Sequence, residues 1–174
     1  LGVNLIDTAQ PYGMGRSEEL IGEAIKGLRD RVIIADKCVS FRKDDQTPAV
    51  RDWSPDVLRF QLEGSLKRLG VDQIDLYQVH NPSMADLDTV CAPGGALEAL
   101  LEAKAAGKIG HIGLTAHLEK VFERALTLDW VETVMFPYNI VETHGEALMQ
   151  KAKEKNVGFI AMKPLAGGAI EDGA

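Results

Sequence analysis

Residues 54–80, SPDVLRFQLEGSLKRLGVDQIDLYQVH, decide the fold class. Ser54 and Pro55 offer a helix N-cap and a proline at the first helical position. Leucines at 58, 62, 66 and 69 then recur at helical spacing, and Gly70 can close the helix. A short apolar run follows at 74–79. The stretch therefore predicts a helix followed by a buried strand, which is the repeating unit of a parallel α/β sheet.

The same alternation runs along the whole chain. Strand-like runs lie near 3–7, 31–37, 74–79, 109–115, 131–137 and 157–162, and their continuous apolar character is typical of strands covered on both faces. Further helices are expected from a cap at Ser17 and at 95–106, 118–127 and 144–155. The apolar stripe expected on the first of these helices comprises Leu20, Ile21, Ala24, Ile25 and Leu28.

The number of units bears on the architecture. A closed (β/α)8 barrel takes about 250 residues. The 174 residues therefore predict an α/β fold of the TIM-barrel type, represented by about six consecutive βα units in a single domain over 1–174. Because the chain opens on Leu1 and ends just after a strand, we expect a barrel truncated at both ends. An open doubly wound sheet is the alternative, but no Gly-x-Gly-x-x-Gly follows the first strand.

The composition and net charge disfavour several classes of binding partner. With 45% hydrophobic and 26% charged residues, the chain resembles an ordinary globular protein. A net charge of -7 without a basic run argues against nucleic-acid and anionic-membrane partners. No long apolar run or basic leader is present in the sequence, which favours the cytoplasm, and Cys38 and Cys91 are expected to be reduced.

Four polar residues stand at or just after strand ends, where barrel enzymes place their active sites. Asp7 ends the first strand, Tyr12 lies in its loop, Lys37 ends the second strand and His80 ends the third. Each has an ordinary explanation as a turn cap, a solvated lysine, a rim tyrosine or a loop histidine. Together they suit the reduction of a carbonyl, which needs a proton donor for the oxygen that becomes negative.

In that chemistry each residue has a distinct role. Tyr12 would donate the proton, and the ammonium of Lys37 would favour the phenolate and make the phenol a better acid. Asp7 would keep Lys37 charged and fixed. His80 would hydrogen-bond the substrate oxygen and orient the substrate.

Several motifs resemble the aldo-keto reductase family. They are GVNLIDTA at 2–9 with Tyr12-Gly13 and Ser17-Glu18, IIADK at 33–37, LKRLGVDQIDLY at 66–77 through His80, GKI at 107–109, IGLT at 112–115, PYN at 137–139 and IAMKPL at 160–165. They span nearly the whole chain in the family's order. The resemblance implies the barrel fold, a small-molecule carbonyl substrate, and Asp7, Tyr12, Lys37 and His80 as the catalytic tetrad.

The resemblance also implies a bound NADPH or NADH, with NADPH favoured. It places Thr115, Met162, Lys163, Leu165 and Gly167 at the cofactor, with Lys163 facing phosphate. The chain departs from the family pattern nearby: Thr115-Ala116-His117 stands where many members have Ser-Asn, Met135 stands where glutamine is common, and Met162 stands where many members stack a tyrosine on the nicotinamide. A thioether can still cover an aromatic face.

Three other functions are open from the residues. Lys163 or Lys37 could form a Schiff base as in aldolases, although Asp7 would keep Lys37 protonated. Ala116, Met135 and Met162 also suit a binding or regulatory subunit that turns over poorly. Metal-dependent hydrolysis is disfavoured, because the four histidines show no ligand motif. We therefore expect none of the residues to ligate a metal. The expected pocket loops at 40–53 and 81–94 do not identify the carbonyl substrate.

Overall fold

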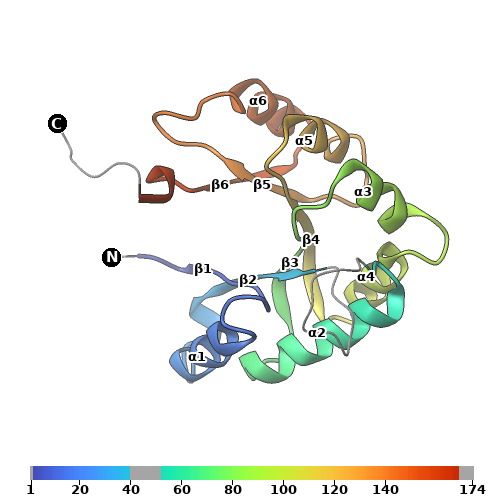
Figure 1. Cartoon of the computed structure of the whole chain (residues 1–174). Coiled ribbons are helices and arrows are strands. Elements are labelled where there is room, and N and C mark those ends of the chain that lie inside the picture. The colour runs from blue at the N-terminus through green and yellow to red at the C-terminus, as the bar shows by residue number, and fades with distance from the viewer. Residues whose placement is uncertain (1, 40–51, 169–174) are drawn as a thin grey trace.

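The computed structural model describes residues 2–39 and 52–168. Six strands form one sheet: β1 (Leu5–Asp7), β2 (Ile33–Cys38), β3 (Ile74–Val79), β4 (Ile109–Thr115), β5 (Thr133–Pro137) and β6 (Gly158–Met162). Their order in the sheet is their order in the chain, and every neighbouring pair is parallel. The predicted architecture is confirmed as a half-barrel, with β1 and β6 at its two free edges (Figure 1).

Six helices lie on the outer side of the curved sheet and connect consecutive strands, two of them between β3 and β4 (Figure 1). They are α1 (Arg16–Ala24), α2 (Pro55–Leu69), α3 (Met84–Cys91), α4 (Ala96–Ala105), α5 (Glu119–Ala125) and α6 (Glu146–Glu154). Short 3-10 turns lie at Arg29–Arg31 and Ala166–Gly168. One buried apolar cluster packs α2 and α4 on the central strands, and a second packs α5 and α6 on β5 and β6.

The helix α2, expected after Ser54, forms as predicted. Ser54 is the N-cap of α2, and its hydroxyl accepts a hydrogen bond from the backbone N–H of Val57 at 3.5 Å. Pro55 occupies the first position, and Gly70 ends the helix with a φ of 67°, a conformation that glycine adopts without strain. The inward leucines at 58, 62, 66 and 69 are all buried.

The start of α1 differs from the expectation. Its N-cap is Gly15 rather than Ser17, whose hydroxyl instead accepts a hydrogen bond from the hydroxyl of Thr8 at 2.9 Å. The predicted apolar stripe is also wrong in part, because Leu20, Ala24 and Leu28 are exposed. The inward face instead presents the side chain of Glu18 ahead of the two isoleucines, because an arginine of α2 pairs with it.

Two further expectations need correction. The strands β1 and β6 are not covered on both faces, because they are the edges of the half-barrel, whereas the strands between them are largely buried. Part of the segment 81–94 is helix α3 rather than loop. Its signal was Ser83 followed by Asp86, which form a reciprocal capping box. The other expected pocket loop is 40–53, and residues 40–51 of it lie outside the described residues.

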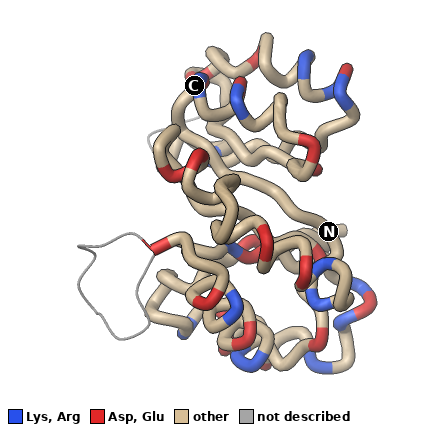
Figure 2. Tube along the Cα trace, turned by 90° about the vertical axis from the view of Figure 1, so that its right-hand side faces the viewer, with Lys and Arg blue, Asp and Glu red and all other residues tan. Residues whose placement is uncertain are grey.

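The surface carries both signs of charge. Figure 2 shows Lys and Arg interspersed with Asp and Glu along the helices of the face it presents. Among the described residues, no helix has the length and apolar character that crossing a membrane requires. Cys38 and Cys91 are free thiols.

Candidate active site

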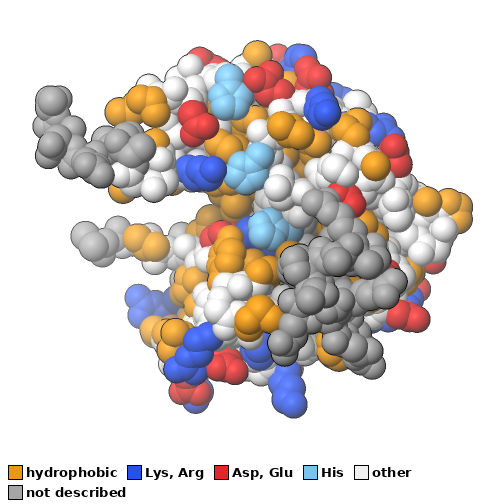
Figure 3. Space-filling view, in the orientation of Figure 1, with side chains coloured by type: hydrophobic (Ala, Val, Ile, Leu, Met, Phe, Trp, Pro, Cys, Tyr) orange, Lys and Arg blue, Asp and Glu red, His pale blue; other side chains and the backbone are white. Residues whose placement is uncertain are grey.

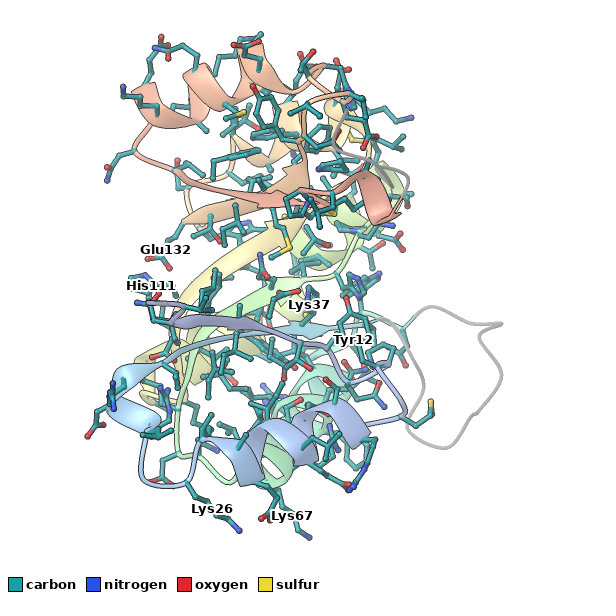
Figure 4. All side chains as sticks on the ribbon, turned by 90° about the vertical axis from the view of Figure 1, so that its left-hand side faces the viewer. Tyr12, Lys26, Lys37, Lys67, His111 and Glu132 are labelled. Carbon is teal, nitrogen blue, oxygen red and sulfur yellow. The ribbon has the colours of Figure 1, made fainter. Side chains whose placement is uncertain are left out.

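The topology brings the predicted residues to one edge of the sheet. Because all six strands are parallel, their carboxyl ends lie together, and Asp7, Lys37 and His80 stand at or just after the ends of β1, β2 and β3. Tyr12 lies in the loop between β1 and α1. Figure 4 shows Tyr12 and Lys37 near each other at this end, whereas His111 and Glu132 lie at the opposite end of the strands.

Lys37 is the most tightly held of these side chains. Its side chain is only 2% exposed, and its ammonium donates to both carboxylate oxygens of Asp7 at 2.7 Å and to the backbone carbonyl of Thr8 at 2.6 Å. An ammonium has three hydrogens, and these three acceptors use all of them. The buried cation is therefore fully satisfied and cannot rotate without breaking a charged hydrogen bond.

Tyr12 lies against this cation. The Nζ atom of Lys37 is 5.2 Å from the centroid of the Tyr12 ring, within the range of a cation–π contact. The ammonium of Lys37 thus contacts Asp7 and the ring of Tyr12 at the same time. Tyr12 is 44% exposed and open to a ligand.

His80 follows β3 and is partly buried. Burial, followed by the positive charge of Lys37 and the neighbouring His117, lowers the pKa of His80 to about 4. Its imidazole is therefore neutral at pH 7. A neutral ring has one donor and one acceptor nitrogen, so His80 can hydrogen-bond an uncharged carbonyl oxygen beside a lysine without adding a second positive charge.

The candidate cofactor residues share the same edge. Thr115 ends β4 and Met162 ends β6, and Lys163, Leu165 and Gly167 follow in the loop after β6. In this loop Lys163 and Gly167 have φ values of 54° and 67°. Thr115 is buried, and its hydroxyl accepts a hydrogen bond from the backbone N–H of Asn81 at 2.8 Å, which leaves its own proton and one lone pair for a ligand.

The sequence prediction missed three contributors. The carbonyl of Thr8 left no side-chain signal. Asn139, two residues after β5, is buried and donates from Nδ2 to the carbonyl of Lys163 at 3.1 Å and to Glu142 at 2.9 Å, which fixes the loop after β6. His117 is largely exposed, and partial burial, followed by the positive charge of Lys163, lowers its pKa. Figure 3 shows histidine side chains gathered on this face.

Comparison with known proteins places this arrangement in a family. The model of the "Aldo/keto reductase family" matches residues 1–173. The chain belongs to the aldo/keto reductase family. Its sequence is 35% identical to "Aldo-keto reductase YhdN" of Bacillus subtilis over 97% of this chain and 50% of that protein. It is 30% identical to the "NADH-specific methylglyoxal reductase" of Escherichia coli over 97% of this chain and 54% of that protein.

Solved aldo-keto reductases share the fold. The holo form of AKR11C1 from Bacillus halodurans superposes with a TM-score of 0.83 and 30% identity, over 96% of this chain and 54% of that one. An aldo-keto reductase from Klebsiella pneumoniae, solved in complex with NADPH, gives a TM-score of 0.79 and 26% identity over 98% and 56% of the two chains. The chain thus spans about half the length of the aldo-keto reductases it matches.

Proposed function

We propose that the complete protein containing this chain is an oxidoreductase that reduces an aldehyde or ketone to an alcohol with NADPH or NADH. The observation that carries the proposal is the buried ammonium of Lys37, which is held by Asp7 and Thr8 beneath the ring of Tyr12. A phenol beside a fixed cation is a suitable proton donor to an oxygen that gains negative charge.

The loop after β6 suits a dinucleotide phosphate. Lys163 supplies a cation, and Gly167 and Gly168 have positive φ values that allow the backbone to approach a ligand closely. Asn139 holds this loop through the carbonyl of Lys163. We infer that Lys163, Leu165 and Gly167 contact the cofactor, with Lys163 facing its phosphate, and that Met162 covers the nicotinamide ring.

The residues expected to contact the nicotinamide carboxamide, at the end of β4, offer few polar side chains. Thr115 keeps one donor, and the buried Ala116 supplies no side-chain hydrogen bond. The bound cofactor would supply hydride to the carbonyl carbon. This chain's residues would then act on the oxygen: Tyr12 donates the proton, Lys37 stabilises the phenolate left behind, and neutral His80 orients the carbonyl by a hydrogen bond.

The same contacts at β4 favour one alternative, an aldo-keto-reductase-like subunit that binds the cofactor and turns over poorly. Met135, on the neighbouring β5, is buried and offers no hydrogen-bond donor, and Thr115 already accepts one hydrogen bond from Asn81, so these positions offer the carboxamide few polar contacts. The two functions differ in one assay. The complete protein is titrated with NADPH and NADH, and oxidation of each is then followed with aldehydes and ketones of varied size. Turnover with alcohol formation supports the reductase, and cofactor binding without turnover supports the subunit.

A further inference from the structure

A buried charged cluster lies behind the candidate active site. Successive residues of a strand point to opposite faces of the sheet, so Asp36 lies on the reverse side of β2 from Lys37, together with the core residues Ile34 and Cys38. Asp36 and Glu18 are both completely buried in the layer between the sheet and the helices. Buried carboxyl groups need partners, because removing a charge from water is costly.

The partner of Glu18 is Arg68 on α2. Its Nε donates to one carboxylate oxygen at 2.7 Å, and its terminal nitrogen donates to the other at 3.2 Å. Two glycines make room for the arginine. A Cβ at Gly15 would lie 2.7 Å from Cδ of Arg68, and a Cβ at Gly64 would lie 2.9 Å from its terminal nitrogen. The arginine therefore packs directly against Gly15.

Gly15 ends the loop that carries Tyr12. Its N–H donates to the carbonyl of Gln10 at 2.8 Å, and the N–H of Ser17 donates to the carbonyl of Tyr12 at 3.2 Å. The hydroxyls of Thr8 and Ser17 close the base of the loop. Tyr12 is 44% exposed, so its position depends more on this loop than on packing of its ring. Arg68, held by Glu18, contacts this loop at Gly15.

Only one of the two carboxylate oxygens of Asp36 accepts a hydrogen bond from the described residues. Its Oδ1 accepts the backbone N–H of Lys37 at 2.8 Å, whereas its buried Oδ2 has no hydrogen-bond partner within the part of the chain that the structure describes. Burial and the adjacent carboxylate of Glu18 raise the pKa of Asp36 to about 7. A proton on Asp36 would convert the repulsion between the two carboxyl groups into a hydrogen bond.

The other groups near Asp36 are neutral or already engaged. Burial raises the pKa of the Cys38 thiol to about 12, and it raises that of the Tyr77 hydroxyl well above its usual value. Ser65 contributes an uncharged hydroxyl. The guanidinium of Arg68 pairs with Glu18, whereas Oδ2 of Asp36 has no hydrogen-bond partner among the described residues. A proton on Asp36 would leave one buried carboxylate, that of Glu18, and would avoid the cost of burying a second negative charge without a partner.

We propose that Arg68 and Glu18 are positioning residues for Tyr12, and that a proton held on Asp36 allows them to fix its loop. The proposal rests on the proposed function, because Tyr12 matters here as the proton donor. When Asp36 releases its proton to solvent, a second buried negative charge competes with Glu18 for Arg68 and draws the arginine away from Gly15. Turnover therefore falls as the pH rises past the titration of Asp36, although none of these side chains touches the substrate.

The test compares matched arginines of α2 in the complete protein. Arg68→Lys keeps the charge but loses the two-pronged grip on Glu18. We expect it to lower kcat by roughly 10- to 100-fold, the scale of small misplacements of a reacting group, while the Kd for the cofactor stays within about twofold. Arg59→Lys is the control, because Arg59 pairs with Glu102 on the exposed surface. Equal kcat values for the two variants would overturn the positioning role.

The proton on Asp36 has its own test. Asp36→Asn mimics the neutral acid, so kcat of this variant should not fall on the alkaline side of neutrality as that of the parent does. In infrared spectra a protonated-carboxyl band at neutral pH should disappear in Asp36→Asn, and it should also disappear in Glu18→Gln, which removes the repelling charge. Unchanged pH profiles in Asp36→Asn, or a band that persists in either variant, would overturn this part. A complete protein that reduces no carbonyl refutes the proposed function and the role of Tyr12, whereas the infrared band still decides on the proton.

Discussion

The ion pair between Asp7 and Lys37 is buried on one side only, and this asymmetry predicts unequal effects of removing its two members. The Lys37 side chain is 2% exposed, whereas that of Asp7 is 37% exposed. In Asp7→Asn the buried ammonium keeps the Thr8 carbonyl but loses its countercharge. Breaking a buried pair costs about 3–5 kcal/mol, and because water reaches the Asp7 side, we expect about 3 kcal/mol.

Lys37→Met should cost less, under about 1.5 kcal/mol, because methionine fills a similar volume and the freed carboxylate of Asp7 is hydrated. Urea denaturation of the complete protein gives both free energies of unfolding. Both variants should also lose carbonyl reduction, since Lys37→Met removes the cation beneath Tyr12 and Asp7→Asn removes the carboxylate that holds this cation in place. If Lys37→Met destabilises the protein as much as Asp7→Asn does, the assignment of the buried charge to Lys37 is wrong.

Three other outcomes follow from the fold. Phe122 is fully buried with ring centroids 5.2 Å from Phe136 and 5.9 Å from Phe159, so Phe122→Ala should lower the free energy of unfolding by about 3–5 kcal/mol, against less than about 1 kcal/mol for exposed Leu101→Ala. A Cβ at Gly22 would lie 2.6 Å from the carbonyl oxygen of Leu69, so Gly22→Ala should force α1 from α2 and cost about 1–3 kcal/mol, measured in the same way. Burial raises the pKa of Glu132, but hydrogen bonds from Lys104, the Ile112 N–H and His111 outweigh it and lower the pKa to about 2. Because the folded-state pKa is depressed, this stabilisation is complete above the unfolded value of 4.5 and is lost as the pH falls toward about 2; the stability difference from Glu132→Gln should shrink over that range, and a constant difference would refute the assignment.

The sequence pattern predicted the order and direction of the strands well, because each strand is a compact apolar run and parallel strands need a crossover helix. It predicted α2 through local chemistry, Ser54-Pro55 and Gly70, that does not depend on distant residues. It predicted the helix α1 but not its inward face, because the inward orientation of Glu18 is set by Arg68, which lies 50 residues away in the chain. Long-range ion pairs of this kind leave no periodic signal.

In the candidate site, too, the sequence predicted some features and not others. Strand ends pointed to Asp7, Lys37 and His80, since topology alone gathers such positions at one edge. The sequence could not show that the Thr8 carbonyl completes the coordination of Lys37, or that the ammonium contacts the ring of Tyr12. Those features depend on the course of the backbone after β1, which several hydrogen bonds of the loop determine together.

The most direct test of the account is the effect of Tyr12→Phe on carbonyl reduction by the complete protein, measured beside its affinity for NADPH and NADH. The control is Tyr138→Phe, because Tyr138 packs edge-on against Phe159 of the apolar core, 6.3 Å between ring centroids. We expect Tyr12→Phe to lower kcat by about 10²–10⁴-fold, the usual contribution of general acid catalysis, with cofactor affinity nearly unchanged, and Tyr138→Phe to keep its activity. A Tyr12→Phe protein that reduces every tested carbonyl at the parental rate would contradict the proposed mechanism.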